Sequence, residues 1–311
     1  MNTIQLTTIF LLLLDMAIPI ILVFVCIVPF AHSRLDWAFR ATLALGYFGS
    51  LFVIIPVCFL GFFCRMLMGL IVVAGIVYGY AHITPGTVGG WRFASSILCA
   101  TLGLGLAGIT VRTIVVGYGC PEDHLDLRSP FRDGTWCVLN GGGSLWINSH
   151  NVPNQVYGMD IMKVNSMGKV VNGLLPLSDK LQDFATFGAD LCSPCDGVIL
   201  YVDDGNEDLP PGQLPPRNTA GNLILLGHGR FKILMGHLKK GSLRVREGDA
   251  VSQGQLIAQC GNSGHATFPH LHISFATGGP SKAPYSGIGV AARFDGRFLV
   301  RNSFLSGAAG N

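Results

Sequence analysis

The sequence predicts an N-terminal α-helical transmembrane bundle of about four spans, followed by a C-terminal domain that is mainly antiparallel β. Half of the 311 residues are hydrophobic and only 13% are charged, whereas soluble domains carry about 25% charged residues. Residues 1–118 hold five arginines, no lysine and two aspartates, while residues 119–311 hold sixteen basic and sixteen acidic residues. Short apolar runs separated by turn residues fill this second part. We therefore expect a transmembrane region at 1–118 and a water-soluble domain at 119–311.

The composition also excludes some classes of protein. A chain this apolar can bury enough surface to fold, so it is not intrinsically disordered. The second part has no net charge, and neither part has the basic stripe that nucleic-acid binding requires. We expect a lipid bilayer as a partner and no nucleic acid.

Four apolar stretches are long enough to cross a bilayer as helices, which takes about 20 residues. They cover approximately residues 7–31, 41–63, 66–84 and 93–116. The first is too long for the core of a signal peptide, and no Lys or Arg precedes it, so we expect it to be retained. Only the surroundings of Arg65 separate the second from the third, which predicts a tight helical hairpin. A single bent helix there would leave three spans instead.

The arginines near the ends of these stretches favour one orientation. With four spans and both chain ends outside, Arg34, Arg40 and Arg92 lie on the inner side, and Arg65 and Arg112 on the outer side. Basic residues are in excess on the cytoplasmic side of membrane proteins. This three-to-two excess is small. It favours a multi-pass protein of the cytoplasmic (inner) membrane whose C-terminal domain faces the periplasm or the cell exterior, an orientation that the function of the second part has to decide.

The last apolar stretch contains Gly103, Gly105 and Gly108, which have the spacing of the dinucleotide-binding motif G-x-G-x-x-G. That motif needs a preceding strand and a polar phosphate site, and this copy lies inside an apolar stretch. Small residues in membrane helices allow neighbouring helices to approach closely. We therefore expect these glycines to serve helix packing.

From about residue 119, short runs of β-branched and apolar residues alternate with clusters of Gly, Pro, Asn and Asp, which is typical of antiparallel β domains. The clearest runs are Gly197–Val202, Asn222–Leu226, Phe231–Met235, Leu256–Cys260 and Leu271–Phe275. The segment Asp203–Asn218 is rich in Asp, Pro and Gly and is expected to be a long exposed loop.

Two histidines of the second part, His270 and His272, are separated by one residue. Because residues i and i+2 of a strand project from the same face, both imidazoles would point into one space. Two imidazoles on one face suit zinc, and a catalytic zinc takes about three protein ligands and leaves one position for water. A third ligand must therefore come from elsewhere in the chain. The chain has no H-E-x-x-H motif, which excludes a helix-borne zinc protease.

Five ordered segments of the second part include this pair and its surroundings: 194–198 (PCDGV), 221–229 (GNLILLGHG), 235–238 (MGHL), 241–257 (GSLRVREGDAVSQGQLI) and 261–272 (GNSGHATFPHLH). Together these segments resemble the lysostaphin-type (LytM-like) zinc endopeptidases, which are peptidoglycan hydrolases. The resemblance covers roughly residues 127–300 and lies outside the four apolar stretches. It implies a β domain of the LytM-like peptidase type.

The resemblance also implies one zinc ion per chain, held by a His, an Asp and the second His of H-x-H. The last of these matches His272, and the Asp matches Asp160 in the segment Tyr157-Gly-Met-Asp-Ile. The first His matches His150, although nine residues separate it from Asp160, where the best-known relatives have three. We expect a longer loop between the two.

The two remaining histidines of the family match His237 and His270. The resemblance implies that they act in catalysis, by orienting and deprotonating the water on the metal and by stabilising the oxyanion. This chemistry is metal-assisted amide hydrolysis without a covalent intermediate. His228 and His265 are expected to be ordinary polar residues at turns.

The second part also contains five cysteines. The pair Cys192 and Cys195 could form a disulfide with each other, or with Cys120 or Cys137, if the domain faces an oxidising compartment. These four could alternatively form a zinc ribbon, but only one pair has the C-x-x-C spacing. Cys260 lies in an expected strand and is expected to be a buried free thiol.

Three functions remain open at this point. The first is a membrane-anchored zinc metalloendopeptidase that hydrolyses peptide bonds, in particular peptidoglycan cross-links, with zinc-activated water. The second is a non-catalytic or regulatory LytM-like module that binds the cell wall and activates another hydrolase. The third is a membrane assembly or transport component whose β domain only docks, although the spans carry few charged residues for an ion path.

Overall fold

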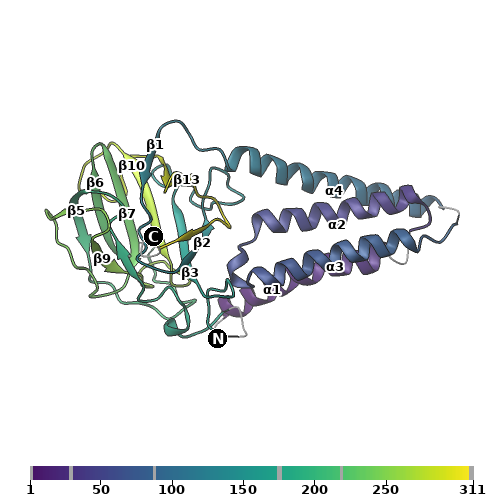
Figure 1. Ribbon diagram of the computed structural model, residues 1–311, viewed down its shortest axis with the longest axis horizontal. Coiled ribbons are helices and arrows are strands. Elements are labelled where there is room, and N and C mark those ends of the chain that lie inside the picture. Colours follow the sequence, from purple (N-terminus) through teal and green to yellow (C-terminus); the bar gives the residue numbers. More distant parts are fainter. Residues whose placement is uncertain (1–2, 28–30, 87–88, 174–176, 218–219, 308–311) are drawn as a thin grey trace.

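The computed structural model describes residues 3–27, 31–86, 89–173, 177–217 and 220–307. Four long helices project side by side from one side of a β-sheet domain (Figure 1). They are α1 (Thr3–Ile21), which continues as a π-helical segment at Leu22–Ile27, α2 (Arg34–Ile54), α3 (Phe62–Ala81) and α4 (Gly90–Gly117). By length and composition, each of the four could cross a membrane.

The ends of these helices differ from the apolar stretches in the sequence. Helix α2 begins at Arg34 and not at residue 41, because the side chain of Ser33 accepts a hydrogen bond from the backbone N–H of Asp36 and caps the helix. It ends at Ile54, shortly before Pro56, which cannot continue a helix. The hairpin connection is therefore at residues 55–61, and Arg65 lies inside α3. The alternative of one bent helix in this region is wrong.

Helices α2 and α4 approach each other closely at two glycines. A Cβ atom added to Gly46 would overlap the backbone of Gly103, and one added to Gly103 would overlap the backbone of Thr42. The expected role in helix packing is therefore confirmed for Gly103. Added Cβ atoms at Gly105 and Gly108 would meet nothing within 4 Å, so these two do not serve this contact.

Substituting leucine for Gly103 is expected to destabilise the helical bundle, because the added side chain has no space between α2 and α4. Overpacking of this kind costs about 1–3 kcal/mol. Thermal unfolding of the full chain in detergent would measure the loss. The matched control is Gly105→Leu, which adds the same side chain to the same helix in open space. Equal melting temperatures for the two variants would contradict the prediction.

In its described residues the β domain contains fourteen strands: β1 (His124–Leu127), β2 (Thr135–Asn140), β3 (Met159–Val164), β4 (Asp190–Cys192), β5 (Gly197–Asp203), β6 (Asn222–His228), β7 (Phe231–Leu238), β8 (Ala250–Val251), β9 (Leu256–Gln259), β10 (Leu271–Thr277), β11 (Ile288–Gly289), β12 (Ala291–Phe294), β13 (Arg297–Phe298) and β14 (Phe304–Ser306). Nine of them form the main sheet, in the order β14-β2-β3-β10-β7-β6-β5-β8 with β11 paired to β10. All pairs in this sheet are antiparallel. The predicted fold class, apolar helices followed by a mainly antiparallel β domain, is confirmed.

The helical region docks directly on the β domain. A 3₁₀ turn at Val57–Phe59, between α2 and α3, packs against residues of β2 and β3 and against Phe268. At the start of α1, Gln5 donates hydrogen bonds to the carbonyls of Ser178 and Pro211, at 2.7 and 3.1 Å. The two regions therefore share a hydrophobic cluster and polar contacts, and the candidate site lies beside this junction.

The cysteines of the β domain form no disulfide in the described part of the chain, so the pairings considered for Cys192, Cys195, Cys120 and Cys137 do not occur there. All four are free thiols. Cys260 is a buried free thiol, as expected.

Candidate metal centre

Strand pairing brings two of the expected ligands together. In the antiparallel pair β3–β10, Asp160 lies directly opposite His272. Side chains at such positions are neighbours on one face of the sheet. As a result, Nδ1 of His272 lies 3.0 Å from Oδ1 of Asp160. The residues come from parts of the chain that are far apart in sequence, and the register of one strand pair joins them.

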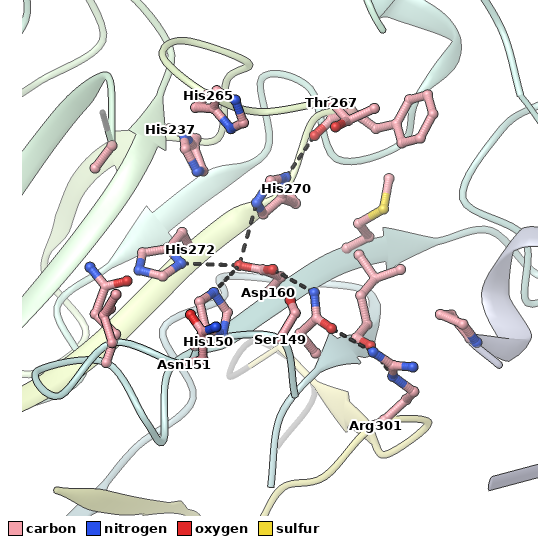
Figure 2. Close-up of a pocket in the computed structure, with 18 of the residues that line it drawn as sticks. Ser149, His150, Asn151, Asp160, His237, His265, Thr267, His270, His272 and Arg301 are labelled. Atoms are coloured by element: carbon pink, nitrogen blue, oxygen red, sulfur yellow. Dashed lines mark hydrogen bonds and ion pairs between the residues drawn. The ribbon is translucent and has the colours of Figure 1, made fainter. Parts of the chain in front are cut away.

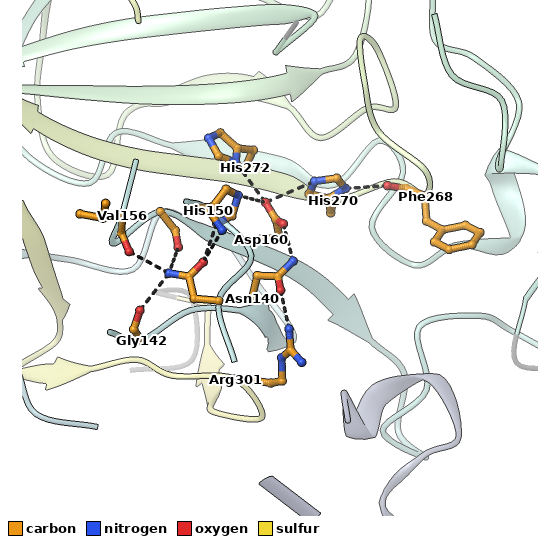
Figure 3. A network of polar contacts seen from close by, with 11 residues as sticks. Asn140, Gly142, His150, Val156, Asp160, Phe268, His270, His272 and Arg301 are labelled. Carbon is orange, nitrogen blue, oxygen red and sulfur yellow. Dashed lines mark hydrogen bonds and ion pairs between the residues drawn. The ribbon is translucent and has the colours of Figure 1, made fainter. Parts of the chain in front are cut away.

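The third expected ligand, His150, lies in the long connection between β2 and β3. Asn148 holds this connection in place: its Nδ2 donates to the carbonyls of Gly142, Val156 and Gly158, at 2.9, 3.1 and 3.1 Å (Figure 3). Its Oδ1 lies 2.8 Å from Nδ1 of His150, in position to accept a hydrogen bond. A proton on Nδ1 leaves the lone pair on Nε2, which lies 3.3 Å from Oδ1 of Asp160.

No pattern in the sequence indicates the supporting role of Asn148. The role depends on three carbonyls that converge only when the connection folds back on itself. The nine residues between His150 and Asp160 therefore form a closed loop that returns His150 to the strand that carries Asp160.

The two expected catalytic histidines lie beside this group (Figure 2). In β7, Gly236 lies opposite His272, and His237 is the next residue along the strand. Nδ1 of His237 lies 2.8 Å from the carbonyl oxygen of Ser263. Its φ of 58° is in the left-handed region, where residues other than glycine are uncommon and which is often found at functional sites. His270 has Nδ1 2.7 Å from the carbonyl of Phe268. The imidazole centroids of His237 and His270 are 4.7 Å apart.

Burial and the neighbouring charges act against each other in this group. Burial alone would raise the pKa of Asp160, but the His150 and His270 imidazoles outweigh it and hold that pKa well below its usual range. Burial also lowers the pKa of His237 well below its ordinary value. For His270 burial acts downward too, but the Asp160 carboxylate outweighs it and raises the pKa. The site therefore favours an ionised Asp160 beside a neutral His237.

The donor set fits a zinc ion. His150, Asp160 and His272 each offer one ligand atom, and these atoms lie within 4.8 Å of one another. Two imidazoles and one carboxylate are a ligand set found in catalytic zinc sites. Nε2 of His272 is buried without a hydrogen-bond partner, so contacts with the described protein do not fully satisfy this imidazole. In the described residues the cysteines contribute to no such cluster, which gives no support to the zinc-ribbon alternative.

A cavity of about 800 Å³ surrounds the group. His150, Asp160, His237, His270 and His272 all line it. Residues of the helical region complete the wall on another side: Thr8 of α1, and Pro56 and Phe59 of the connection between α2 and α3. The ring of Phe59 lies edge-to-face on Phe268, with centroids 6.0 Å apart. Residues of both parts of the chain thus line the candidate site.

The two histidines expected to be ordinary polar residues differ from each other. His228 points its Nδ1 to the carbonyl of Asp196, at 2.7 Å, and does not line the cavity. His265 lines the cavity beside His237 and His270 (Figure 2). The expectation for His265 therefore missed its place at the site, because the sequence did not show where the turn before His270 folds.

Comparisons with known proteins bear on the same region. The sequence model described as "Peptidase family M23" matches residues 180–284. An uncharacterized metalloprotease from Haemophilus influenzae is 36% identical over 121 residues, which are 35% of this chain and 25% of the relative. The chain therefore matches about a quarter of the length of that relative.

Solved structures are similar at lower identity. The catalytic domain of the prophage-encoded M23 protein EnpA from Enterococcus faecalis is 23% identical, with a TM-score of 0.24. That similarity covers 39% of this chain and 83% of the other. The catalytic domain of lysostaphin from Staphylococcus simulans is 23% identical, with a TM-score of 0.23, over 38% of this chain and 84% of the other.

The matched segment contains His237, His270 and His272, whereas His150 and Asp160 precede it. The fold brings the five side chains into one cavity across that boundary. Residues 180–284 therefore match the model of peptidase family M23, and the chain joins this matched segment to four long apolar helices.

Proposed function

We propose that the chain is a membrane-anchored zinc metalloendopeptidase that hydrolyses peptide cross-links of bacterial peptidoglycan. One observation carries the proposal: the candidate metal ligands and two further histidines line a single cavity in a chain that has a segment matching peptidase family M23. In this proposal His150, Asp160 and His272 hold the zinc. Zinc bound there supplies Lewis acidity and makes water a stronger nucleophile near neutral pH.

The hydrogen bonds of the other two histidines support their proposed catalytic roles. A proton on Nδ1 of His237, donated to the carbonyl of Ser263, leaves Nε2 free to accept a proton from the attacking water. The bond from Nδ1 of His270 to the carbonyl of Phe268 fixes that ring beside His237, with the two ring centroids 4.7 Å apart. We propose that His270 holds the reacting groups and stabilises the developing oxyanion. Their presence gives no support to the non-catalytic alternative.

The cavity wall supports a substrate at the membrane surface. Thr8, Pro56 and Phe59 belong to the helical region and line the same cavity as the metal group. A peptide in the cavity would therefore contact the end of the helical bundle that adjoins the β domain. We propose that the enzyme acts on wall peptides next to the membrane.

Substituting alanine for Phe59 is expected to weaken substrate binding, because the cavity loses an aromatic side of its wall. An aromatic contact contributes about 0.5–1.5 kcal/mol, so KM should rise roughly 2- to 10-fold while zinc content stays unchanged. Steady-state kinetics on a soluble wall peptide would measure this. The matched control is Phe63→Ala, which removes an exposed aromatic side chain that lies outside this cavity. An unchanged KM for Phe59→Ala would contradict the proposed wall.

The arrangement of the helices supports the proposed location. Helix α2 runs from Arg34 at the far end of the bundle to Ile54 at the β domain, so Arg34, Arg40 and the first turn of α4 with Arg92 lie away from that domain (Figure 1). Arg65 and Arg112 lie toward the domain. With the excess of arginine on the cytoplasmic side, the β domain faces the periplasm or the cell exterior, where peptidoglycan is found.

The test uses the full chain purified in detergent. Elemental analysis gives the zinc content, and release of peptide fragments from purified peptidoglycan gives the activity. We expect about one zinc per chain, loss of activity on chelation and recovery when zinc is restored. Absence of zinc binding would overturn the proposal. Zinc binding without hydrolysis of any wall preparation would instead favour the regulatory module.

A further inference from the structure

Asp160 is held from the side opposite the histidines. In the pair β2–β3, Asn140 lies opposite Asp160, just after a bulge, so that Asn140, Asp160 and His272 form a row across three neighbouring strands. Nδ2 of Asn140 donates a hydrogen bond of 2.8 Å to Oδ2 of Asp160 (Figure 3). The other carboxylate oxygen, Oδ1, is the atom that faces all three imidazoles. The two oxygens of Asp160 therefore have separate partners.

Arg301 holds Asn140 in turn. It lies between β13 and β14, and its Nη2 donates to Oδ1 of Asn140 at 2.5 Å. Its Nε donates to the carbonyl of Leu139 at 2.6 Å. Its Nη1 donates to the carbonyl of Ile54, the last residue of α2, and to that of Trp146 at 3.3 Å. One guanidinium group thus joins the end of a membrane helix to the strand that contacts Asp160.

The donor and acceptor atoms of Arg301, Asn140 and Asp160 allow only one direction for the hydrogen bonds that join them. A guanidinium group can only donate hydrogen bonds, so the amide of Asn140 must turn its oxygen toward Arg301. Its nitrogen then faces Asp160 and occupies Oδ2. With Oδ2 occupied, Oδ1 is the oxygen left for a metal. Arg301 therefore determines which carboxylate oxygen is available, although it does not touch Asp160 itself.

We propose that Asn140 and Arg301 are positioning residues for the metal centre, and that they couple the orientation of Asp160 to the C-terminal end of α2. The inference rests on the proposed metal site. It assigns to the helical region a role beyond anchoring, because a backbone carbonyl of α2 takes part in holding a metal ligand. Groups that orient metal ligands typically change metal affinity by 10- to 100-fold when they are removed.

The experiment measures zinc affinity of the full chain in detergent by competition with a chromophoric chelator. Arg301→Met and Asn140→Ala are each expected to weaken zinc binding by roughly 10- to 100-fold. The double variant should lose little more than either single variant, because both act through the same bond to Asp160. Cobalt(II) in place of zinc gives a second readout, since its visible absorption reports a changed position of the carboxylate.

Asn302 provides a matched control. It follows Arg301 and also binds the helical region: its Oδ1 accepts from the N–H of Val57, and its Nδ2 donates to the carbonyls of Phe52 and Ile55. It makes no bond to Asn140. Its φ of 69° suits glycine, so Asn302→Gly removes these contacts with little backbone strain. We expect this variant to bind zinc like the unaltered chain.

Two results would overturn the inference. One is unchanged zinc affinity in Arg301→Met and Asn140→Ala. The other is an equal loss in Asn302→Gly, which would show that general loosening of the junction is the cause. Thermal unfolding of the zinc-free proteins shows whether Arg301→Met folds. If it does not, the zinc affinity of Asn140→Ala decides whether the inference holds, because this variant leaves the bond from Arg301 to Ile54 in place. Zinc binding by the unaltered chain tests the proposed function separately.

Discussion

Replacing His272 with alanine is expected to remove zinc and peptidase activity together. His272 supplies one of the three candidate ligand atoms and lies opposite Asp160 in the β3–β10 register. With one imidazole lost, only two protein ligands remain. Removing a residue that only orients a metal ligand lowers metal affinity by up to roughly 100-fold, and we expect the loss of a ligand itself to lower zinc affinity by more than that. Zinc content and hydrolysis of peptidoglycan, measured on the same preparation of the full chain, check this result.

The control for this variant is His228→Ala. His228 lies in the same domain but outside the cavity, with its Nδ1 on the carbonyl of Asp196. It should retain full zinc content and activity. The assignment of the metal site would be wrong if His272→Ala kept its zinc, or if His228→Ala lost it to the same extent.

Changing His237 or His270 is expected to abolish most of the activity while zinc remains bound. Neither residue belongs to the candidate ligand group, yet both line its cavity. A positioned side chain that transfers a proton contributes about 10²- to 10⁴-fold to the rate, so kcat should fall by that factor. For His237 the suitable variant is His237→Asn, because asparagine tolerates the left-handed backbone found there. His270→Ala serves for the other position.

These two variants also separate catalysis from binding. A regulatory module that only binds the cell wall would keep its cellular function in both variants, because zinc and fold are retained. An enzyme would lose that function in proportion to kcat. Full activity of His237→Asn would exclude His237 as the proton acceptor, and loss of zinc from either variant would show that it belongs to the metal site.

Much of the fold follows from local patterns in the sequence. Apolar length alone indicated four helices, because crossing a bilayer requires about 20 apolar residues whatever lies around them. The runs at 222–226 and 231–235 lie within β6 and β7, because strands are recognisable from short β-branched segments between turn residues. The ends of the helices were harder to predict from the sequence. A cap such as Ser33 and a stop such as Pro56 act through polar and backbone groups that an apolar pattern does not register.

The sequence predicted part of the candidate site. The spacing of His270 and His272 placed two imidazoles on one face, because the period of a strand is two residues. The assignment of His150 came from a resemblance, and the sequence could not show how a connection of nine residues returns to Asp160. Asn148 does this through three carbonyls that meet only in the folded connection.

By itself, the sequence determined the division into apolar helices and a β domain, and the residue types available for a metal centre. The tertiary structure alone decided which side chains support that centre and what encloses it. Phe59, Asn140 and Arg301 lie in three separate segments and match no motif, yet they meet at one site. The physical reason is that strand register and the docking of the helices on the sheet are set by packing over the whole domain, whereas sequence patterns record only neighbours along the chain.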